Sequence, residues 1–264
     1  MVTETDRQAV RMLVRLREDF QAMRKRMDNR IGRKADGSDQ NIEAREFRPE
    51  DLENFTAVAD NAKEQEKQIE KMLLKTLRRF PIYNDYLKHV KGVGTIAAGW
   101  IIAEFDIHKA TTVSKMWQYC GLNPDMVAGK KRVENPDGTF SLVPTGQMIR
   151  GDRLTPGHVS PFNKRLRTAM VGVLADGFIK AQAPHAMEYY YPYKERLSHE
   201  ENEVLHVGDY KPWKDVSKGH RDRAAKRKMI KEFLKDLHVA WRTIEGLPVR
   251  GTYQEEYLGH KHGA

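Results

Sequence analysis

Two long stretches near the N-terminus repeat apolar residues at spacings of three and four, and this pattern constrains the fold most. In residues 4–29 the stripe consists of Leu13, Leu16, Phe20, Met23 and Met27. In residues 49–80 it consists of Leu52, Phe55, Ala59, Ala62, Ile69, Leu73 and Phe80, with Glu66 as an interruption. So narrow a stripe is typical of a coiled-coil seam. A polar segment at 30–47 joins the two stretches, so we expect an antiparallel helical hairpin over residues 1–80. Dimerisation through the same seams is the alternative.

The composition changes after Pro81, where glycine, proline and aromatic residues become frequent. Lys91-Gly92-Val93-Gly94-Thr95 lies between two apolar segments, 83–90 and 96–105, which is the layout of a helix-hairpin-helix unit. We expect both glycines to take positive φ and to allow close approach of a partner. Free N–H groups at the start of the second helix suit a phosphate oxygen. The alternative is a helix-helix turn that binds nothing.

The remaining segments alternate between helical and extended patterns. We expect a helix at 113–120, a β-hairpin over 129–144 with its turn at 135–138, an irregular stretch at 145–161, and a helix at 163–181. Residues 184–219 are punctuated by aromatic residues and proline. A last helix at 220–244 carries the core stripe Ala224, Met229, Ile230, Phe233, Leu234, Leu237 and Trp241. The fold class is therefore mainly α, with a helical hairpin at 1–80, a helical domain at 81–250 and a flexible tail at 251–264.

Charge and composition limit the partners. Lys and Arg total 46 against 37 Asp and Glu, which gives a net charge of +9 and favours nucleic acid. No apolar run is long enough for a membrane span, so we expect no membrane partner. The polar N-terminus lacks a signal-peptide core, and the single cysteine, Cys120, excludes an internal disulfide. We expect a cytoplasmic, nucleoid-associated protein.

Basic residues gather around the irregular stretch and along the last helix, where residues 214–235 hold nine Lys or Arg against three acids. Such clusters favour phosphate contacts, with a solvated basic face as the alternative and, for Arg167, a structural salt bridge. The candidate DNA-binding residues are Lys91, Gly92, Val93, Gly94, Thr95, Lys130, Lys131, Arg150, Arg153, Lys164, Arg165, Arg167, Lys226 and Arg227.

No catalytic residue can be assigned from the sequence. Glu104 and Asp106 follow an apolar run, but a two-metal nuclease needs three or four carboxylates from separate elements. We interpret them as helix-end acids and expect no metal site and no cofactor in this chain. The tyrosines at 189–191 are interpreted as packing residues.

Four motifs occur in an order that resembles one family. They are Lys91-Gly92-Val93-Gly94 followed by Ala97-Ala98, Met116-Trp117-Gln118-Tyr119-Cys120-Gly121-Leu122-Asn123-Pro124, Phe162-Asn163-Lys164-Arg165-Leu166-Arg167, and the helix with Ala224-Ala225 and Arg227-Lys228. Together they resemble the C-terminal domain of the Piv-type DEDD transposases, the insertion-sequence 110/116/902 group. The resemblance covers roughly residues 81–250, and the expected helical hairpin is similar to the coiled coil that precedes this domain in the family.

The resemblance implies DNA transposition or site-specific recombination by a mobile element or virus, with DNA and a guide RNA as partners and a homo-oligomer formed through the coiled coil. Metal-dependent chemistry in the family belongs to an N-terminal RuvC-like nuclease domain. We expect that domain to be absent here, so Mg²⁺ is expected as a cofactor only if a partner supplies the nuclease domain in trans.

The family also keeps a nucleophilic serine in a Ser-Gly pair, where this chain has Ala128-Gly129, and neither Ser141 nor Ser160 falls at that position. Whether the chain is an enzyme therefore stays open. The sequence predicts a transposase-family DNA-binding protein. The alternative is a non-enzymatic architectural or regulatory nucleic-acid-binding protein derived from such a transposase.

Overall fold

The structure is a computed structural model that describes residues 3–33, 47–206 and 209–250. The expected tail at 251–264 and most of the loop expected at 30–47 lie outside the described residues. The fold is mainly α, as predicted, and small antiparallel strand pairs are its only β-structure among the described residues. No helix in these ranges has the length and apolar character needed to cross a membrane.

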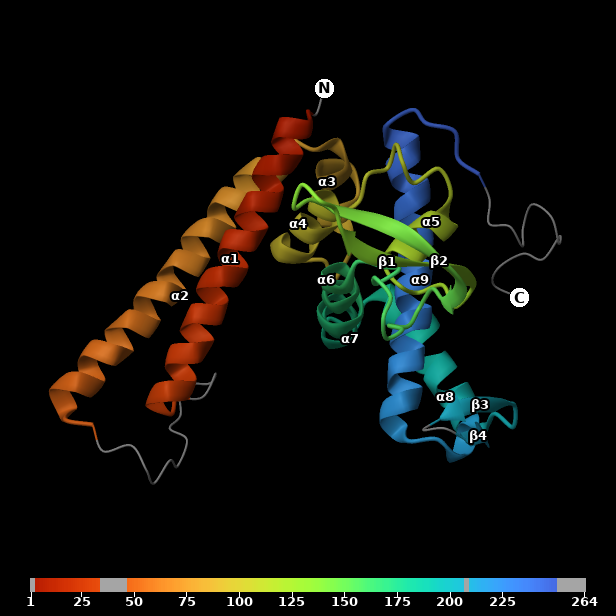
Figure 1. The fold of residues 1–264 in the computed structure, drawn as a ribbon. Coiled ribbons are helices and arrows are strands. Elements are labelled where there is room, and N and C mark those ends of the chain that lie inside the picture. The colour runs from red at the N-terminus through yellow and green to blue at the C-terminus, as the bar shows by residue number, and fades with distance from the viewer. Residues whose placement is uncertain (1–2, 34–46, 207–208, 251–264) are drawn as a thin grey trace.

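The N-terminal arm is a hairpin of two long helices, α1 (Glu4–Ile31) and α2 (Pro49–Leu77), which lean away from the rest of the molecule (Figure 1). Thr3 starts α1 with a capping box, in which its hydroxyl accepts from the Asp6 N–H and the Asp6 carboxylate accepts from the Thr3 N–H. Pro49 occupies the first position of α2, where its missing N–H costs nothing. The antiparallel hairpin predicted from the apolar stripes is confirmed.

The predicted α2 stripe is confirmed from Ala59 onward, but it is wrong at Leu52 and Phe55, which are 40% and 37% exposed. On α2 the buried positions are Ala59, Ala62, Glu66, Ile69, Leu73, Thr76 and Leu77, at heptad spacing. On α1 the predicted stripe is wrong at Leu16 and Met23, which are 38% and 44% exposed, while Val10 and Val14 outside it are buried. The interior positions farther along α1 hold arginines that pair with Glu66, so the apolar stripe lies beside the seam.

A short linker leads from the arm to the domain through α3 (Pro81–Asp85) and the 3₁₀ turn η1 (Leu87–His89). The helix predicted at 83–90 is therefore split at Tyr86, whose φ of −135° is not helical. The following helix, α4 (Thr95–Glu104), is buried along most of its length and packs against the arm. A Cβ on Gly99 would lie 2.9 Å from Val14 and 3.0 Å from Leu73, so the core of the domain continues into the arm.

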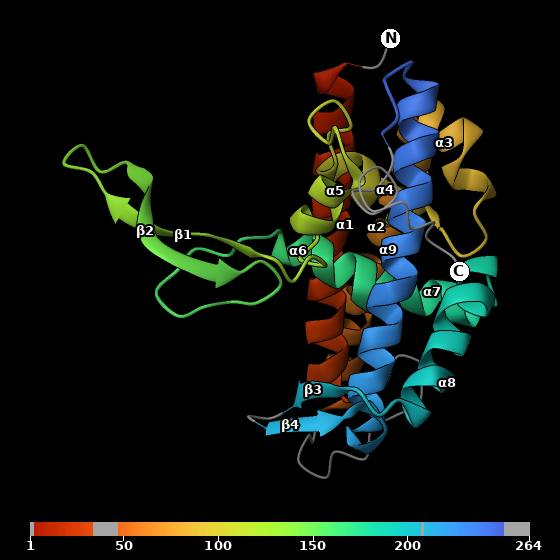
Figure 2. The same ribbon diagram turned by 90° about the vertical axis from the view of Figure 1, so that its right-hand side faces the viewer.

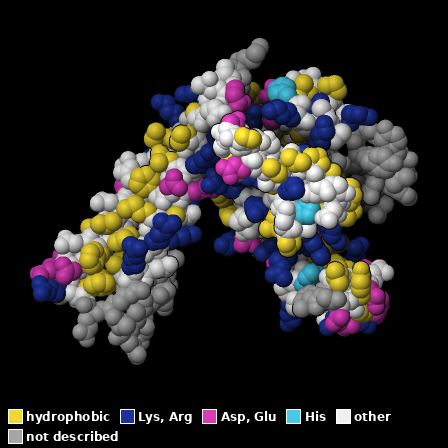
Figure 3. All heavy atoms as spheres, viewed as in Figure 1, with side chains coloured by type: hydrophobic (Ala, Val, Ile, Leu, Met, Phe, Trp, Pro, Cys, Tyr) yellow, Lys and Arg dark blue, Asp and Glu magenta, His cyan; other side chains and the backbone are white. Residues whose placement is uncertain are grey.

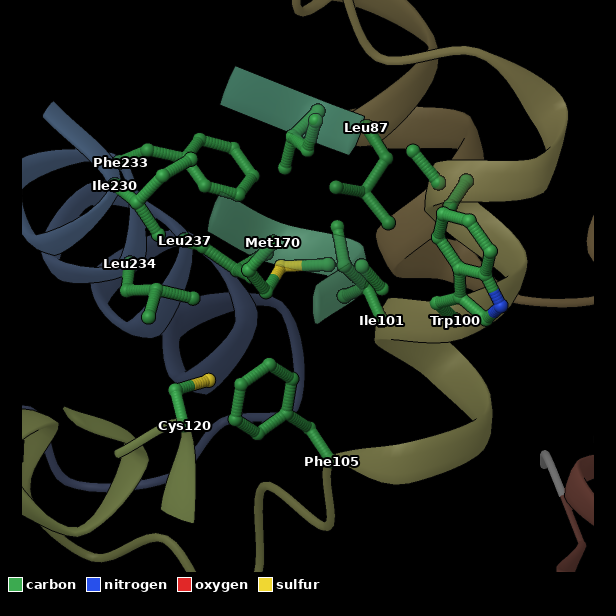
Figure 4. Close-up of a cluster of buried hydrophobic side chains, with 14 of the residues drawn as sticks. Leu87, Trp100, Ile101, Phe105, Cys120, Met170, Ile230, Phe233, Leu234 and Leu237 are labelled. Atoms are coloured by element: carbon green, nitrogen blue, oxygen red, sulfur yellow. The ribbon is translucent and has the colours of Figure 1, made fainter. Parts of the chain in front are cut away.

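The domain core forms around the last helix, as Figure 4 shows for side chains of α4, α9 and their neighbours. Every residue of the core stripe predicted for that helix is buried. The helices of this domain, besides α4, are α5 (Val113–Tyr119), α6 (Lys164–Arg167), η2 (Thr168–Leu174), α7 (Ala175–Lys180), η3 (Ala186–Tyr190), α8 (Tyr191–His199), η4 (Trp213–Asp215) and α9 (Lys218–Ile244). The helix predicted at 163–181 is confirmed, with Asn163 as its N-cap and a π-helical middle.

A two-stranded ribbon, β1 (Met126–Glu134) and β2 (Phe140–Arg150), projects sideways from the helices (Figure 2). Its predicted turn is confirmed by the Gly138 N–H donating to the Asn135 carbonyl at 3.0 Å. The prediction of an irregular stretch at 145–161 is wrong for residues 145–150. These residues belong to β2, which continues to pair with β1 beyond a bulge. A second pair, β3 (Glu203–His206) and β4 (Asp209–Pro212), was not predicted.

Candidate nucleic-acid interface

The ribbon β1–β2 exposes side chains on both of its faces. Residues paired directly across the strands share a face, so Arg132 and Leu142 lie on one face while Lys131 and Val143 lie on the other. The exposed apolar side chains of the ribbon, with their exposed fractions, are Met126 53%, Val133 36%, Phe140 51%, Leu142 57%, Val143 39% and Met148 57%. The predicted contact residues Lys130 and Lys131 are both exposed.

The segment after β2 braces the base of the ribbon. The Val159 N–H donates to the Lys130 carbonyl at 2.7 Å, and the Thr145 hydroxyl lies 3.1 Å from Nε2 of His158. Gly129 is buried under the same imidazole, since a Cβ there would lie 2.6 Å from Cδ2 of His158. The ribbon is thus held at its base while its outer half projects into solvent.

Three of the predicted arginines converge on Asp152 at this base. Arg150 pairs with the Asp152 carboxylate through two hydrogen bonds, of 2.9 Å from Nε and 3.1 Å from Nη2, and this bond raises the pKa of Arg150. Arg167 donates from Nη1 to the Asp152 backbone carbonyl at 2.5 Å and lies 4.8 Å from the Phe162 ring centroid. The third, Arg227, comes from α9.

Arg227 is half-buried, and among the described residues no carboxylate lies within ion-pair distance of it. Burial lowers the pKa of Arg227, and repulsion from Arg167 and Arg223 lowers it further, against the attraction of Asp152. Arg223, Arg227 and Lys231 recur every four residues and so follow one face of α9. We name Arg150, Arg167, Arg223 and Arg227 the arginine cluster. The carboxylate that attracts Arg227, Asp152, is already held by Arg150.

Lys226, the neighbour of Arg227, has a different environment. Its Nζ lies 2.8 Å from Asp176 and 3.0 Å from Asp222, and these two bonds outweigh its burial and raise its pKa. Other cations of the predicted basic stretch are paired as well, with Lys214 on Glu201 and Lys228 and Lys235 on Glu232. Much of the charge in this stretch therefore serves internal ion pairs.

The glycines of the helix-hairpin-helix turn have unequal roles. Gly92 has the expected positive φ of +94°. The prediction of positive φ for Gly94 is wrong, because this residue is an extended N-cap with φ −85° and ψ 173°. A Cβ on Gly92 would lie 2.7 Å from Cδ1 of Phe178, but one on Gly94 would meet nothing within 4 Å. Gly92 thus serves packing against α7, and the accessible part of the turn is Lys91 and Gly94, with Val93 and Thr95 half-buried.

The other predicted contact residues lie on the surface near the start of α6. Arg153 and Lys164 are exposed, and Arg165 pairs with Glu18 of the arm at 3.4 Å. The sequence prediction omitted Arg132 and Arg223, although both continue basic runs, one at 130–132 and one at every fourth residue of α9. That spacing was the signal that could have found them.

Two of the family-like motifs pack on each other. Asn163 donates from its backbone N–H to the Tyr119 carbonyl at 2.9 Å, and its side-chain amide donates to the Tyr119 hydroxyl at 3.0 Å and to Glu104 at 2.8 Å. Gly121 lies under the Phe162 ring, where a Cβ would approach within 2.6 Å. These contacts give both motifs a structural reason for their residue types.

The candidate nucleophile positions can also be located. Ala128 is exposed on β1, the Ser141 hydroxyl lies 2.8 Å from the Asn135 side chain, and Ser160 donates to the Phe162 carbonyl at 2.7 Å. Within the described ranges, no three His, Cys, Asp or Glu side chains gather as metal ligands would. In comparisons with known proteins, no family model and no curated protein matches this chain.

Proposed function

We propose that this chain is a nucleic-acid-binding protein of the transposase type, acting in DNA transposition or site-specific recombination of a mobile element or virus. The observation that carries the nucleic-acid part is the arginine cluster beneath a basic ribbon. A half-buried arginine with two arginine neighbours is costly without an anion. A phosphate oxygen on a DNA backbone supplies that anion and accepts the planar guanidinium donors. The transposase part rests on the ordered motifs alone.

The helical arm supports a second part of the proposal, a homo-oligomer formed through the coiled coil. Its surface exposes Leu16 and Met23 on α1 and Val58 and Met72 on α2, with exposed fractions of 38% to 55%. Figure 3 shows hydrophobic side chains running along this arm. Exposed apolar strips of this kind mark association surfaces in soluble proteins. A guide RNA belongs to the same proposal through the family resemblance, and a nucleoid location belongs to it through the proposed DNA binding.

A second candidate function is a non-enzymatic architectural or regulatory DNA-binding protein. The observation that favours it is Ala128, which places a methyl group where the resembled family has its nucleophile. In this case any cleavage with Mg²⁺ depends on a nuclease domain supplied in trans. The variant Ala128→Ser discriminates between the two candidates, because gain of strand cleavage or of a covalent protein–DNA adduct would indicate a disabled enzyme.

The binding proposal is tested by fluorescence anisotropy with a 30-base-pair DNA duplex at rising salt. If several phosphates are neutralised, the affinity falls steeply, by a factor on the order of 10³ between about 50 and 200 mM salt. The same titration with an RNA hairpin measures RNA binding. An affinity that does not respond to salt, or no binding to any nucleic acid, would contradict the proposal.

A further inference from the structure

We propose that the β1–β2 ribbon enters the major groove of B-form duplex DNA and contacts base edges there. This inference rests on the proposed nucleic-acid function and specifies the substrate as double-stranded DNA. It concerns the ribbon as a reading element, whereas the arginine cluster needs only a phosphate backbone.

The dimensions of the ribbon fit the groove. Two paired strands lie about 4.8 Å apart, and the nine residues of β1 span about 30 Å. The major groove of B-form DNA is about 12 Å wide and about 8.5 Å deep, and it admits a two-stranded ribbon with its side chains. Double-stranded RNA is a poor alternative, because its major groove is too deep and narrow for side chains to read.

Both faces of the ribbon carry the chemistry that a groove presents. The groove has a phosphate wall on each side and base edges at its floor, so an element inside it needs cations on both faces. Lys130 and Arg132 lie on one face of the ribbon and Lys131 on the other. A protein partner docked on one side would leave the cations and apolar groups of the opposite face in water.

Exposed apolar side chains lie beside these cations on each face of the ribbon. Leu142 and Val143 lie on opposite faces near the outer end of the ribbon, and apolar side chains of this size contact the thymine methyl group. Gln147 is exposed nearer the base, and its amide matches the paired donor and acceptor of adenine. Arg132 is held over the Phe140 ring at 3.6 Å, which directs its guanidinium along the ribbon.

The base of the ribbon places the arginine cluster where the DNA backbone would leave the groove. Gly151, the residue after β2, donates to the Asp125 carbonyl at 2.9 Å, and Arg150 and Asp152 flank it. A duplex that holds the ribbon in its groove therefore brings a phosphate strand toward Arg167 and Arg227. Base contact and backbone contact then come from one continuous surface.

The single cysteine allows a direct test. Cys120 is fully buried and burial raises the pKa of its thiol, so it does not compete with a thiol placed on the surface. Pro136→Cys puts a reactive thiol at the exposed turn of the ribbon, and Lys88→Cys puts one on the exposed η1 turn as a control. Each full-length variant is coupled to an iron–EDTA group, bound to duplex DNA and triggered to produce hydroxyl radicals.

Cutting by the Pro136→Cys conjugate is expected on both strands, with maxima displaced toward the 5′ side as for a source in the major groove. The Lys88→Cys conjugate is expected to cut weakly or not at all. Maxima displaced toward the 3′ side, which indicate the minor groove, or an absence of cuts by a conjugate that still binds DNA, would overturn the inference.

A second measurement uses unlabelled protein. The double variant Leu142→Ser/Val143→Ser is expected to lose at least fivefold in affinity for duplex DNA, while Val173→Ser, at a 50% exposed position of η2, loses less than twofold. Unchanged DNA affinity combined with lost self-association in sedimentation would make the ribbon a protein contact and overturn the inference. If the unmodified protein binds no nucleic acid, the proposed function itself fails. If it binds DNA but the ribbon variants do not lose affinity, only the inference about the ribbon fails.

Discussion

Nε of Arg24 lies 2.5 Å from Oε1 of Glu66, and this pair joins α1 to α2 in the interior of the arm. Glu66 is 5% exposed and also lies 3.5 Å from Arg17, while Arg24 reaches Asp28 at 3.2 Å. The hydrogen bond to Glu66 raises the pKa of Arg24. Slipping the two helices by one turn would bury these charges without partners, so the pair selects one register for the hairpin.

We expect Glu66→Ala to lower the free energy of unfolding by about 2 kcal/mol, because it removes the carboxylate that Arg17 and Arg24 share and leaves them only Glu70 and Asp28. The measurement is urea unfolding followed by circular dichroism. The control is Glu64→Ala, which removes only the exposed pair with Lys67 and should cost less than about 1 kcal/mol. Equal losses for the two variants would contradict a structural role for Glu66.

Gly92→Ala and Gly94→Ala should show that only one glycine of the helix-hairpin-helix turn is needed for packing. Gly92→Ala forces positive φ on an alanine and a contact with Phe178, so we expect a loss of about 1–3 kcal/mol. Gly94→Ala meets open space and should change stability by less than about 0.5 kcal/mol. Thermal unfolding measures both. A larger loss for Gly94→Ala than for Gly92→Ala would reverse these assignments.

Substitution by glutamine at the adjacent residues Lys226 and Arg227 should have opposite effects on stability and on DNA affinity. Arg227→Gln removes a half-buried cation without a carboxylate partner, so stability should hold within about 0.5 kcal/mol or rise, while the slope of log affinity against log salt should shrink by about one. Lys226→Gln breaks two ion pairs and should cost about 1 kcal/mol, with DNA affinity retained. Chemical unfolding and anisotropy on the same two proteins test this. Loss of DNA affinity only in Lys226→Gln would contradict this assignment, because it would show that Lys226 and not Arg227 contacts the phosphate.

Stability in acid should depend on Asp222. Burial alone would raise the pKa of this carboxyl, but hydrogen bonds from Tyr190, Lys226 and Lys194 outweigh it and lower the pKa. A lowered folded-state pKa adds stability above the unfolded value of about 4, and that stability is lost as the pH falls further. We therefore expect Asp222→Asn to flatten the fall in thermal midpoint below about pH 4. A wild-type slope in the variant would show that other carboxylates control the acid transition.

Several elements of this protein follow from local pattern alone. The heptad spacing of Ala59, Ala62, Ile69 and Leu73 predicts a helix with one buried face, and the stripe of the last helix predicts its core positions. The turn at 135–138 predicts the ribbon. In each case neighbouring residues supply the periodicity or the turn chemistry, so no distant contact is needed to infer the element.

The tertiary structure decided which polar residues have partners. Lys226 and Arg227 are adjacent cations in the sequence, yet one lies between two carboxylates and the other lies among arginines. The partners come from elements as distant as α7 and the segment after β2, and their approach depends on packing that one-dimensional spacing does not encode. Likewise, Gly92 meets Phe178 only because α7 returns to the turn, and Glu66 is an interior ion because Arg17 and Arg24 face it across the hairpin. The sequence by itself thus determined the long helices, the ribbon and the basic character, whereas long-range packing decided which of the described charges are neutralised inside the fold and which are not.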